Sequence, residues 1–278
     1  MLYYDYHIEF EQKDTNYHKK TIFIKQAHID NFLYKTSYFE LSNSYARYLS
    51  NHKNFTNSCF ALEIKDILIL SWDSTCKTIT YKPLKYFRHY LLRFWILHTF
   101  LPIVLEHTTN YHFLHASGTI INNKAILFIA NSNGGKSTIS HYFTNQLHPY
   151  LGDDAIAISY QNNQYMAIPS HPFCRHYRKY QSLGDKVKIF ASKPYPIKAL
   201  YILKPLSANQ AISIKPLYGI KKVQALYDSS FIKFDTLKQK HLKTISSLAN
   251  HTQISELFIP WDLDQLPNVY KHIINSLQ

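Results

Sequence analysis

Glycine is scarce in this chain, and its positions are clustered. The 278 residues include only six glycines, and four of them lie between positions 118 and 152: Gly118, Gly134, Gly135 and Gly152. Glycine adopts positive φ without strain and lets a backbone approach a ligand closely. A chain that uses so little glycine and concentrates it in one segment is expected to have a binding site in that segment.

The centre of this segment predicts a strand, a loop and a helix in succession. An apolar run at 126–129 leads into the loop 130–137, with the sequence ANSNGGKS, and a helical pattern follows. The loop matches the phosphate-binding motif G-x-x-x-x-G-K-[ST] except that Ala130 replaces the first glycine. In such a loop, backbone N–H groups and the positive end of the helix surround phosphate oxygens.

The motif assigns an expected role to each loop residue. Lys136 is expected to reach the β- and γ-phosphates of ATP, and the Ser137 hydroxyl is expected to ligate Mg²⁺. The residues expected to bind the nucleotide are Asn131, Ser132, Asn133, Gly134, Gly135, Lys136, Ser137 and Thr138.

Two adjacent carboxylates follow the loop. Asp153 and Asp154 come directly after Gly152 and open the apolar run AIAISY. Adjacent carboxylates at a strand end are costly unless a cation or a proton donor compensates their charge. Gly-Asp-Asp is also ordinary turn chemistry, but the neighbouring phosphate loop favours a functional interpretation, with one carboxylate serving Mg²⁺ and the other serving as a base.

Three segments together resemble the HPr kinase/phosphorylase-like family, in particular its C-terminal catalytic domain. They are LHASG at 114–118, ILFIANSNGGKST at 126–138 and LGDDAIAI at 151–158. The same folding unit occurs in phosphoenolpyruvate carboxykinases and is similar to stand-alone kinases of peptide-biosynthesis clusters. The resemblance implies an α/β (α+β) fold with a nucleotide-binding catalytic P-loop domain over residues 108–278.

The resemblance also implies a reaction and the roles of its residues. By this resemblance, His115 is expected to support the acidic pair, Asp153 to be the base toward a seryl hydroxyl, and Asp154 to be a second acid linked to Mg²⁺. The implied activity is Mg²⁺-dependent transfer of phosphate from ATP to a Ser of a protein or of a peptide such as a ribosomal precursor peptide. The family also implies a homo-oligomer.

Two alternatives stay open for the nucleotide-binding domain. One is a regulatory or pseudoenzyme module that binds nucleotide without turnover, because Ala130 replaces a loop glycine. The other is a kinase that acts on free serine or a similar small metabolite.

The charge of the chain favours an anionic partner. The formal net charge is +13 at pH 7, and a basic stretch lies within 171–204. Arg175 and Arg178 are expected there to hold the transferred phosphate or an acidic acceptor. Nucleic-acid binding has no recognised module to support it, and a solvated basic surface is the remaining interpretation.

The first 107 residues are expected to be rich in β-structure and to end in an amphipathic helix. Short strands are predicted at 3–10, 21–26, 60–70 and 77–82, and a helical pattern begins near Leu84 that Pro102 is expected to end or kink. The N-terminus has no apolar stretch of the signal-peptide type. The apolar run at 90–105 is too short to span a membrane, so a soluble cytoplasmic protein is expected.

Overall fold

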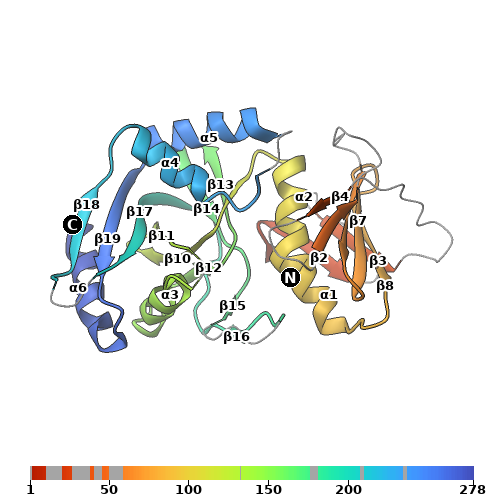
Figure 1. Ribbon diagram of the computed structural model, residues 1–278, viewed down its shortest axis with the longest axis horizontal. Coiled ribbons are helices and arrows are strands. Elements are labelled where there is room, and N and C mark those ends of the chain that lie inside the picture. The colour runs from red at the N-terminus through yellow and green to blue at the C-terminus, as the bar shows by residue number, and fades with distance from the viewer. Residues whose placement is uncertain are drawn as a thin grey trace. The chain divides into compact units, whose positions relative to one another are not determined.

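The computed structural model describes residues 2–10, 21–26, 38–40, 46–49, 59–131, 133–175, 181–206, 210–233 and 237–278. The chain divides into two compact units (Figure 1). The first comprises Met1–Thr109 with Tyr180–Ser182, and the second comprises Asn110–Lys179 with Leu183–Gln278.

The N-terminal unit contains a sheet in the order β1-β2-β3-β8-β7-β6-β5-β4. Its strands are β1 (Leu2–Tyr3), β2 (Tyr6–Phe10), β3 (Thr21–Gln26), β4 (Tyr38–Glu40), β5 (Ala46–Leu49), β6 (Cys59–Ile64), β7 (Leu68–Asp73) and β8 (Thr78–Pro83). The apolar run 60–70, predicted as one strand, is a hairpin of β6 and β7. The turn passes through Asp66, whose φ is 60°, and aspartate tolerates this left-handed conformation better than most residues.

The helical part of this unit begins at His89 and continues past Pro102. It consists of α1 (His89–Trp95), a π-helical segment η2 (Ile96–Phe100) and α2 (Leu101–Thr108). The expectation that Pro102 ends the helix is wrong, because the helical segments continue through this proline to Thr108. Across the described residues, no helix combines the length and apolar character needed to cross a membrane.

The C-terminal unit contains, within its described residues, a nine-stranded sheet and a separate two-stranded pair of β15 (Phe173–Cys174) and β16 (Asp185–Lys186). The strands of the large sheet are β9 (His112–Leu114), β10 (Ala116–Ile121), β11 (Lys124–Ile129), β12 (Tyr150–Gly152), β13 (Ile156–Gln161), β14 (Gln164–Ile168), β17 (Tyr195–Pro205), β18 (Ser213–Pro216) and β19 (Gln253–Ile259).

Strand β17 organises this sheet. Its start pairs antiparallel with β14, whereas its remainder pairs parallel with β11 on one side and with β19 on the other. The carboxyl ends of β11, β17 and β19 therefore meet at one edge of the sheet. In open α/β sheets, ligands bind outside this edge.

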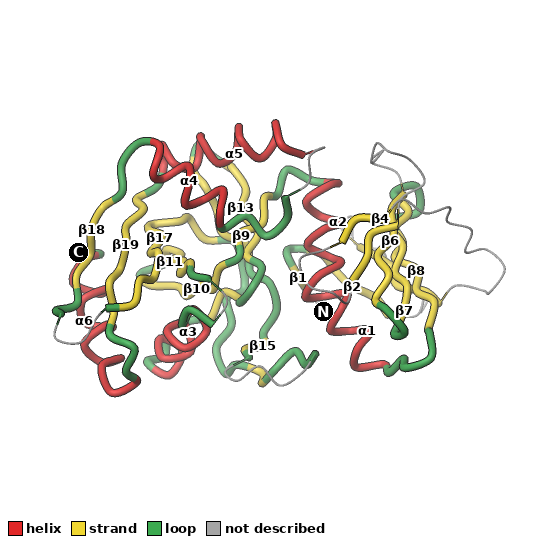
Figure 2. Tube along the Cα trace, viewed as in Figure 1, coloured by secondary structure: helices red, strands yellow, loops and turns green. Residues whose placement is uncertain are grey.

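Helices cover both faces of the parallel strands (Figure 2). Along β11, Ala125, Leu127 and Ile129 pack in one apolar cluster, and the alternate residues Ile126 and Phe128 pack in another, as expected for a strand buried on both faces. The first cluster includes side chains of α4 (Ile220–Asp228) and α5 (Lys238–His251), and the second includes side chains of α3 (Lys136–Asn145) and α6 (Leu266–Ser276). The predicted mixed α/β class is confirmed.

Candidate active site

The glycine-rich loop joins the carboxyl end of β11 to the start of α3. Gly135 precedes the helix with φ of 81°, and Asn133 has φ of 63°. The Gly134 N–H donates to the carbonyl oxygen of Asn131 at 2.9 Å. A side chain at Gly134 would place its Cβ 2.5 Å from the Cβ of Ala130. The methyl group of Ala130 therefore fits the turn because position 134 is a glycine.

Lys136 is folded back against this loop. Its side chain is buried, and its Nζ donates to the carbonyl oxygens of Ala130 at 3.0 Å and Asn131 at 3.3 Å. The same ammonium lies 3.0 Å from Nε2 of His115. Because an ammonium can only donate, Nε2 accepts, and the proton of a neutral His115 ring is on Nδ1.

His115 lies in a break between two strands. The residues around it form one apolar run in the sequence, but β9 pairs with β13 whereas β10 pairs with β11, and His115 belongs to neither strand. Its backbone N–H donates to the Ser229 carbonyl at 2.6 Å. Its Nδ1 is 3.1 Å from the backbone carbonyl oxygen of Asp154. His115 thus joins Lys136 to the backbone of the acidic pair.

The acidic pair is buried beneath the first turn of α3. Ser137 Oγ donates to Oδ2 of Asp153 at 2.7 Å, and the Asp154 N–H donates to Oδ1 of Asp153 at 3.0 Å. Asp154 has φ of 64° and forms an ion pair with the guanidinium of Arg175. Each carboxylate therefore has its own polar partner, a hydroxyl for Asp153 and a guanidinium for Asp154.

Burial shifts the proton affinity of this pair. Desolvation, followed by the charge of Asp154, raises the pKa of Asp153 from 3.8 to about 7, although Ser137 and Arg175 oppose the shift. Cys174 is buried nearby, and desolvation raises the pKa of its thiol to about 12. The thiol is therefore neutral at physiological pH and adds no charge to the site.

Gly152 is required by a close approach behind the acidic pair. A Cβ at this position would lie 2.0 Å from Oγ of Ser170. A larger residue would displace the backbone that leads into Asp153. Glycine at position 152 therefore keeps the backbone of the acidic pair in its observed position.

Two cavities adjoin the loop at the carboxyl edge of the sheet. The first, about 520 Å³, is lined by the loop and first turn of α3 from Asn133 to Ile139, by Arg175, and by residues 259–263 and Leu266. The second, about 970 Å³, is lined by His115, by residues 129–131, by the end of β17, by Glu256 of β19 and by one side of α4. Asn133, Gly134 and Trp261 line both cavities.

The structure brings most of the expected site residues together. His115, Lys136, Ser137, Asp153, Asp154 and Arg175 are linked by the contacts above. Asn131 lines the second cavity and Thr138 the first. Ser132 and Arg178 lie outside the described residues. Trp261 was not predicted, since it belongs to none of the motifs, and its position just after the apolar run 254–259 was the available signal.

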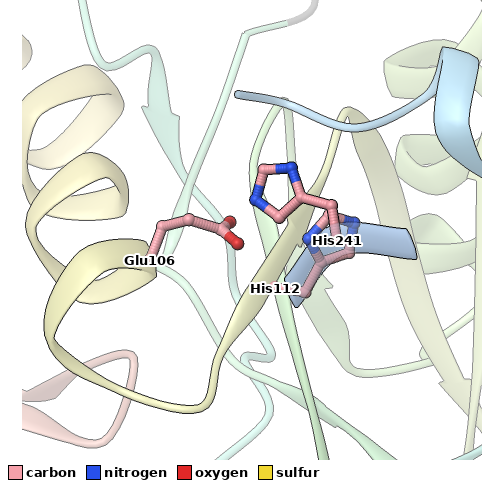
Figure 3. Close-up of side chains that lie close together, drawn as sticks. All are labelled: Glu106, His112 and His241. Carbon is pink, nitrogen blue, oxygen red and sulfur yellow. The ribbon is translucent and has the colours of Figure 1, made fainter. Parts of the chain in front are cut away.

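A pair of buried histidines lies elsewhere in the same unit. The rings of His112, on β9, and His241, on α5, have centroids 4.9 Å apart (Figure 3). Ser230 Oγ is 3.2 Å from Nε2 of His112. The pair packs α5 against the sheet.

No protein-family model matches the sequence, and no curated protein matches it. Among solved structures, the chain is similar to the Hpr(Ser) kinase/phosphatase from Coxiella burnetii, with a TM-score of 0.36 and 12% sequence identity. This match covers 60% of the present chain and 99% of that chain.

Proposed function

We propose that this site transfers the γ-phosphate of ATP to a hydroxyl group in a Mg²⁺-dependent reaction. The observation that carries the proposal is the 2.7 Å hydrogen bond from Ser137 to Asp153 directly beneath the loop that contains Lys136. This contact joins the expected metal-binding hydroxyl to the expected base. In this proposal, residues 108–278 form a catalytic P-loop domain of the HPr-kinase-like type.

The loop residues fit a triphosphate and a divalent cation. The first turn of α3 contains no acidic residue, so its positive end is available to an anion. The Ser137 hydroxyl and the carboxylate of Asp154 provide oxygen ligands of the kind that Mg²⁺ prefers. When bound, Mg²⁺ neutralises charge on the phosphate oxygens.

Each side chain has a separate task in the proposed reaction. Asp153 accepts the proton of the attacking hydroxyl, and a base with a pKa near 7 is well matched to physiological pH. Lys136 and Arg175 supply positive charge to the transferred phosphoryl group. His115 positions Lys136 through Nε2.

The second cavity is our candidate for the acceptor. It shares Asn133 and Gly134 with the first cavity, so groups bound in the two cavities would meet at the loop. Its volume of about 970 Å³ is at the upper end of the range for ligand sites. This size favours a Ser-containing segment of a peptide or protein over free serine.

The proposal is tested by thermal unfolding of the full chain with and without Mg²⁺-ATP, combined with a phosphate-transfer assay on Ser-containing peptides. We expect ATP to raise the melting temperature of the wild type and of a control variant, Lys124→Ala, which changes an exposed lysine on β11. Lys136→Ala is expected to abolish the rise. Equal stabilisation of Lys136→Ala would contradict the phosphate-loop assignment, and stabilisation without transfer to peptide or serine would favour a nucleotide-binding module without turnover.

A further inference from the structure

The first cavity has two chemically different ends. One end consists of the loop and the first turn of α3, which present Lys136, Ser137 and Thr138. The other part of the lining is apolar and consists of Pro260, Trp261, Leu263 and Leu266, which follow the carboxyl end of β19. A cavity that is polar at one end and apolar at the other suits a ligand with a charged group and a flat apolar group.

Trp261 is unusually exposed for a residue of its size. Trp261 is 64% exposed, and Leu263, which lines the same cavity, is 65% exposed. Single exposed apolar residues are common, but neighbouring ones that line one cavity mark a binding surface. The indole carbons of Trp261 lie 4.0 Å from the position that a Cβ of Gly135 would occupy, so the ring is adjacent to the phosphate loop.

Asp262 adds a hydrogen-bonding group to the apolar end. Its Oδ1 accepts the backbone N–H of Asp264 at 3.0 Å, which fixes the side chain at the start of the short helix η4 (Leu263–Gln265). An ionised carboxylate only accepts hydrogen bonds. Amino groups and ring N–H groups on a purine are donors, so the carboxylate matches a purine better than it matches a purely apolar ligand.

We propose that Trp261 is a stacking platform for the purine base of the bound nucleotide, with Asp262 facing the base edge. The proposal rests on the function proposed above, since the phosphates are placed on the loop. Base–aromatic stacking changes affinity by about tenfold or more when the aromatic residue is truncated. The base is thereby held on the part of the cavity wall that residues 260–263 form.

The test compares two ligands that share the phosphates and differ in the base. Isothermal titration of the full chain with Mg²⁺-ATP and with Mg²⁺-tripolyphosphate is carried out on the wild type, Trp261→Ala, Trp261→Phe and Lys136→Ala. The control variant is Tyr218→Ala, because Tyr218 is an aromatic residue of the same unit that is 75% exposed and lines neither cavity.

We expect Trp261→Ala to weaken ATP binding about tenfold and to leave tripolyphosphate binding unchanged. Trp261→Phe retains most of the ATP affinity, and Tyr218→Ala resembles the wild type. Unchanged ATP affinity in Trp261→Ala, or an equal loss for both ligands, would overturn the stacking role while leaving the phosphate site in place. A wild type that binds neither ligand would instead overturn the proposed function, and the stacking role with it.

Intrinsic fluorescence gives a second measurement that does not depend on the alanine variant folding. The chain contains three tryptophans, and the other two, Trp72 and Trp95, lie in the N-terminal unit. ATP is expected to change the emission of the wild type, whereas tripolyphosphate is expected to leave it unchanged. A change of the same size in Trp261→Phe would contradict the proposal. Comparing ATP with GTP under the same conditions shows which purine Asp262 favours.

Discussion

The two sides of the phosphate loop hold their charged groups in different ways. On the acidic side, the carboxylates of Asp153 and Asp154 contact a hydroxyl and a guanidinium, respectively. On the lysine side, Lys136 donates to loop carbonyl oxygens and to His115. Partners on the acidic side control charge and proton affinity, whereas the loop carbonyls keep the ammonium of Lys136 in the place where the proposed function puts a phosphate. The two sides should therefore respond to substitution in different ways.

The largest expected effect comes from removing the proposed base, Asp153, while keeping the shape of the acidic side. Asp153→Asn should lower the rate of phosphate transfer on the order of 10²–10⁴-fold, because the amide cannot accept the proton. The ATP-induced rise in melting temperature should remain, since Lys136 is intact. Asp185→Asn, a change at an exposed acid of the same unit, serves as the control. Full activity in Asp153→Asn would contradict the assignment of the base.

The next effect concerns the stability of the acidic side. Arg175→Ala leaves the buried carboxylate of Asp154 without its ion-pair partner, and breaking a buried pair in this way costs about 3 kcal/mol of unfolding free energy. Adding Asp154→Asn removes the charge and should recover part of the loss. Urea denaturation of the single and double variants measures both quantities. A double variant no more stable than Arg175→Ala would argue against the pairing.

The pH dependence of stability provides a third comparison. The pKa of Asp153 is raised on folding, so the folded state retains a proton that the unfolded state releases between about pH 4 and 7. Over this range the contribution of Asp153 to the unfolding free energy falls as pH rises, by up to about 1.4 kcal/mol per pH unit. The measurement is denaturation of both proteins in EDTA across this pH range. We expect the unfolding free energy of the wild type, minus that of Asp153→Asn, to fall as the pH rises. A difference that does not vary with pH would contradict the raised pKa.

The smallest expected effect is the loss of unfolding free energy when Gly135 of the loop is substituted. Gly135→Ala should reduce the unfolding free energy by about 1 kcal/mol, because φ of 81° is unfavourable for a residue with a Cβ. The space around Gly135 accommodates a methyl group, whose nearest contacts would be at 4.0 Å. Gly135→Asn should cost less, since asparagine visits this conformation more readily. Equal losses in the two variants would indicate that contact with Trp261, and not φ, determines the cost.

The parts of the site that lie close in sequence were the most predictable. The loop 130–137 is a contiguous motif, and Asp153 follows Ser137 by 16 residues, so local patterns were sufficient to predict that they lie together. His115 was identified by its position, but its local structure was not predicted. Residues 113–121 form one apolar run because both β9 and β10 are buried, and the change of partner strand at His115 depends on tertiary pairing.

Other features depend on contacts between distant segments. Trp261 adjoins Gly135 only because β19 pairs in parallel with β17, and β17 pairs in parallel with β11. No local pattern encodes these pairings. The continuation of the helix through Pro102 was also missed, because the π-helical segment before it is not visible in the spacing of apolar residues.

The central place of β17 has a consequence for how the C-terminal unit folds. Strand β11, which precedes the glycine-rich loop, cannot complete its pairing until β17, some seventy residues later, has been synthesised. The pairing of β17 is in turn complete only when β19 has formed. Parallel pairings across such separations form slowly because loop closure must precede them. During synthesis the glycine-rich loop would therefore emerge well before its cavities exist, and the proposed nucleotide would stabilise only the finished unit.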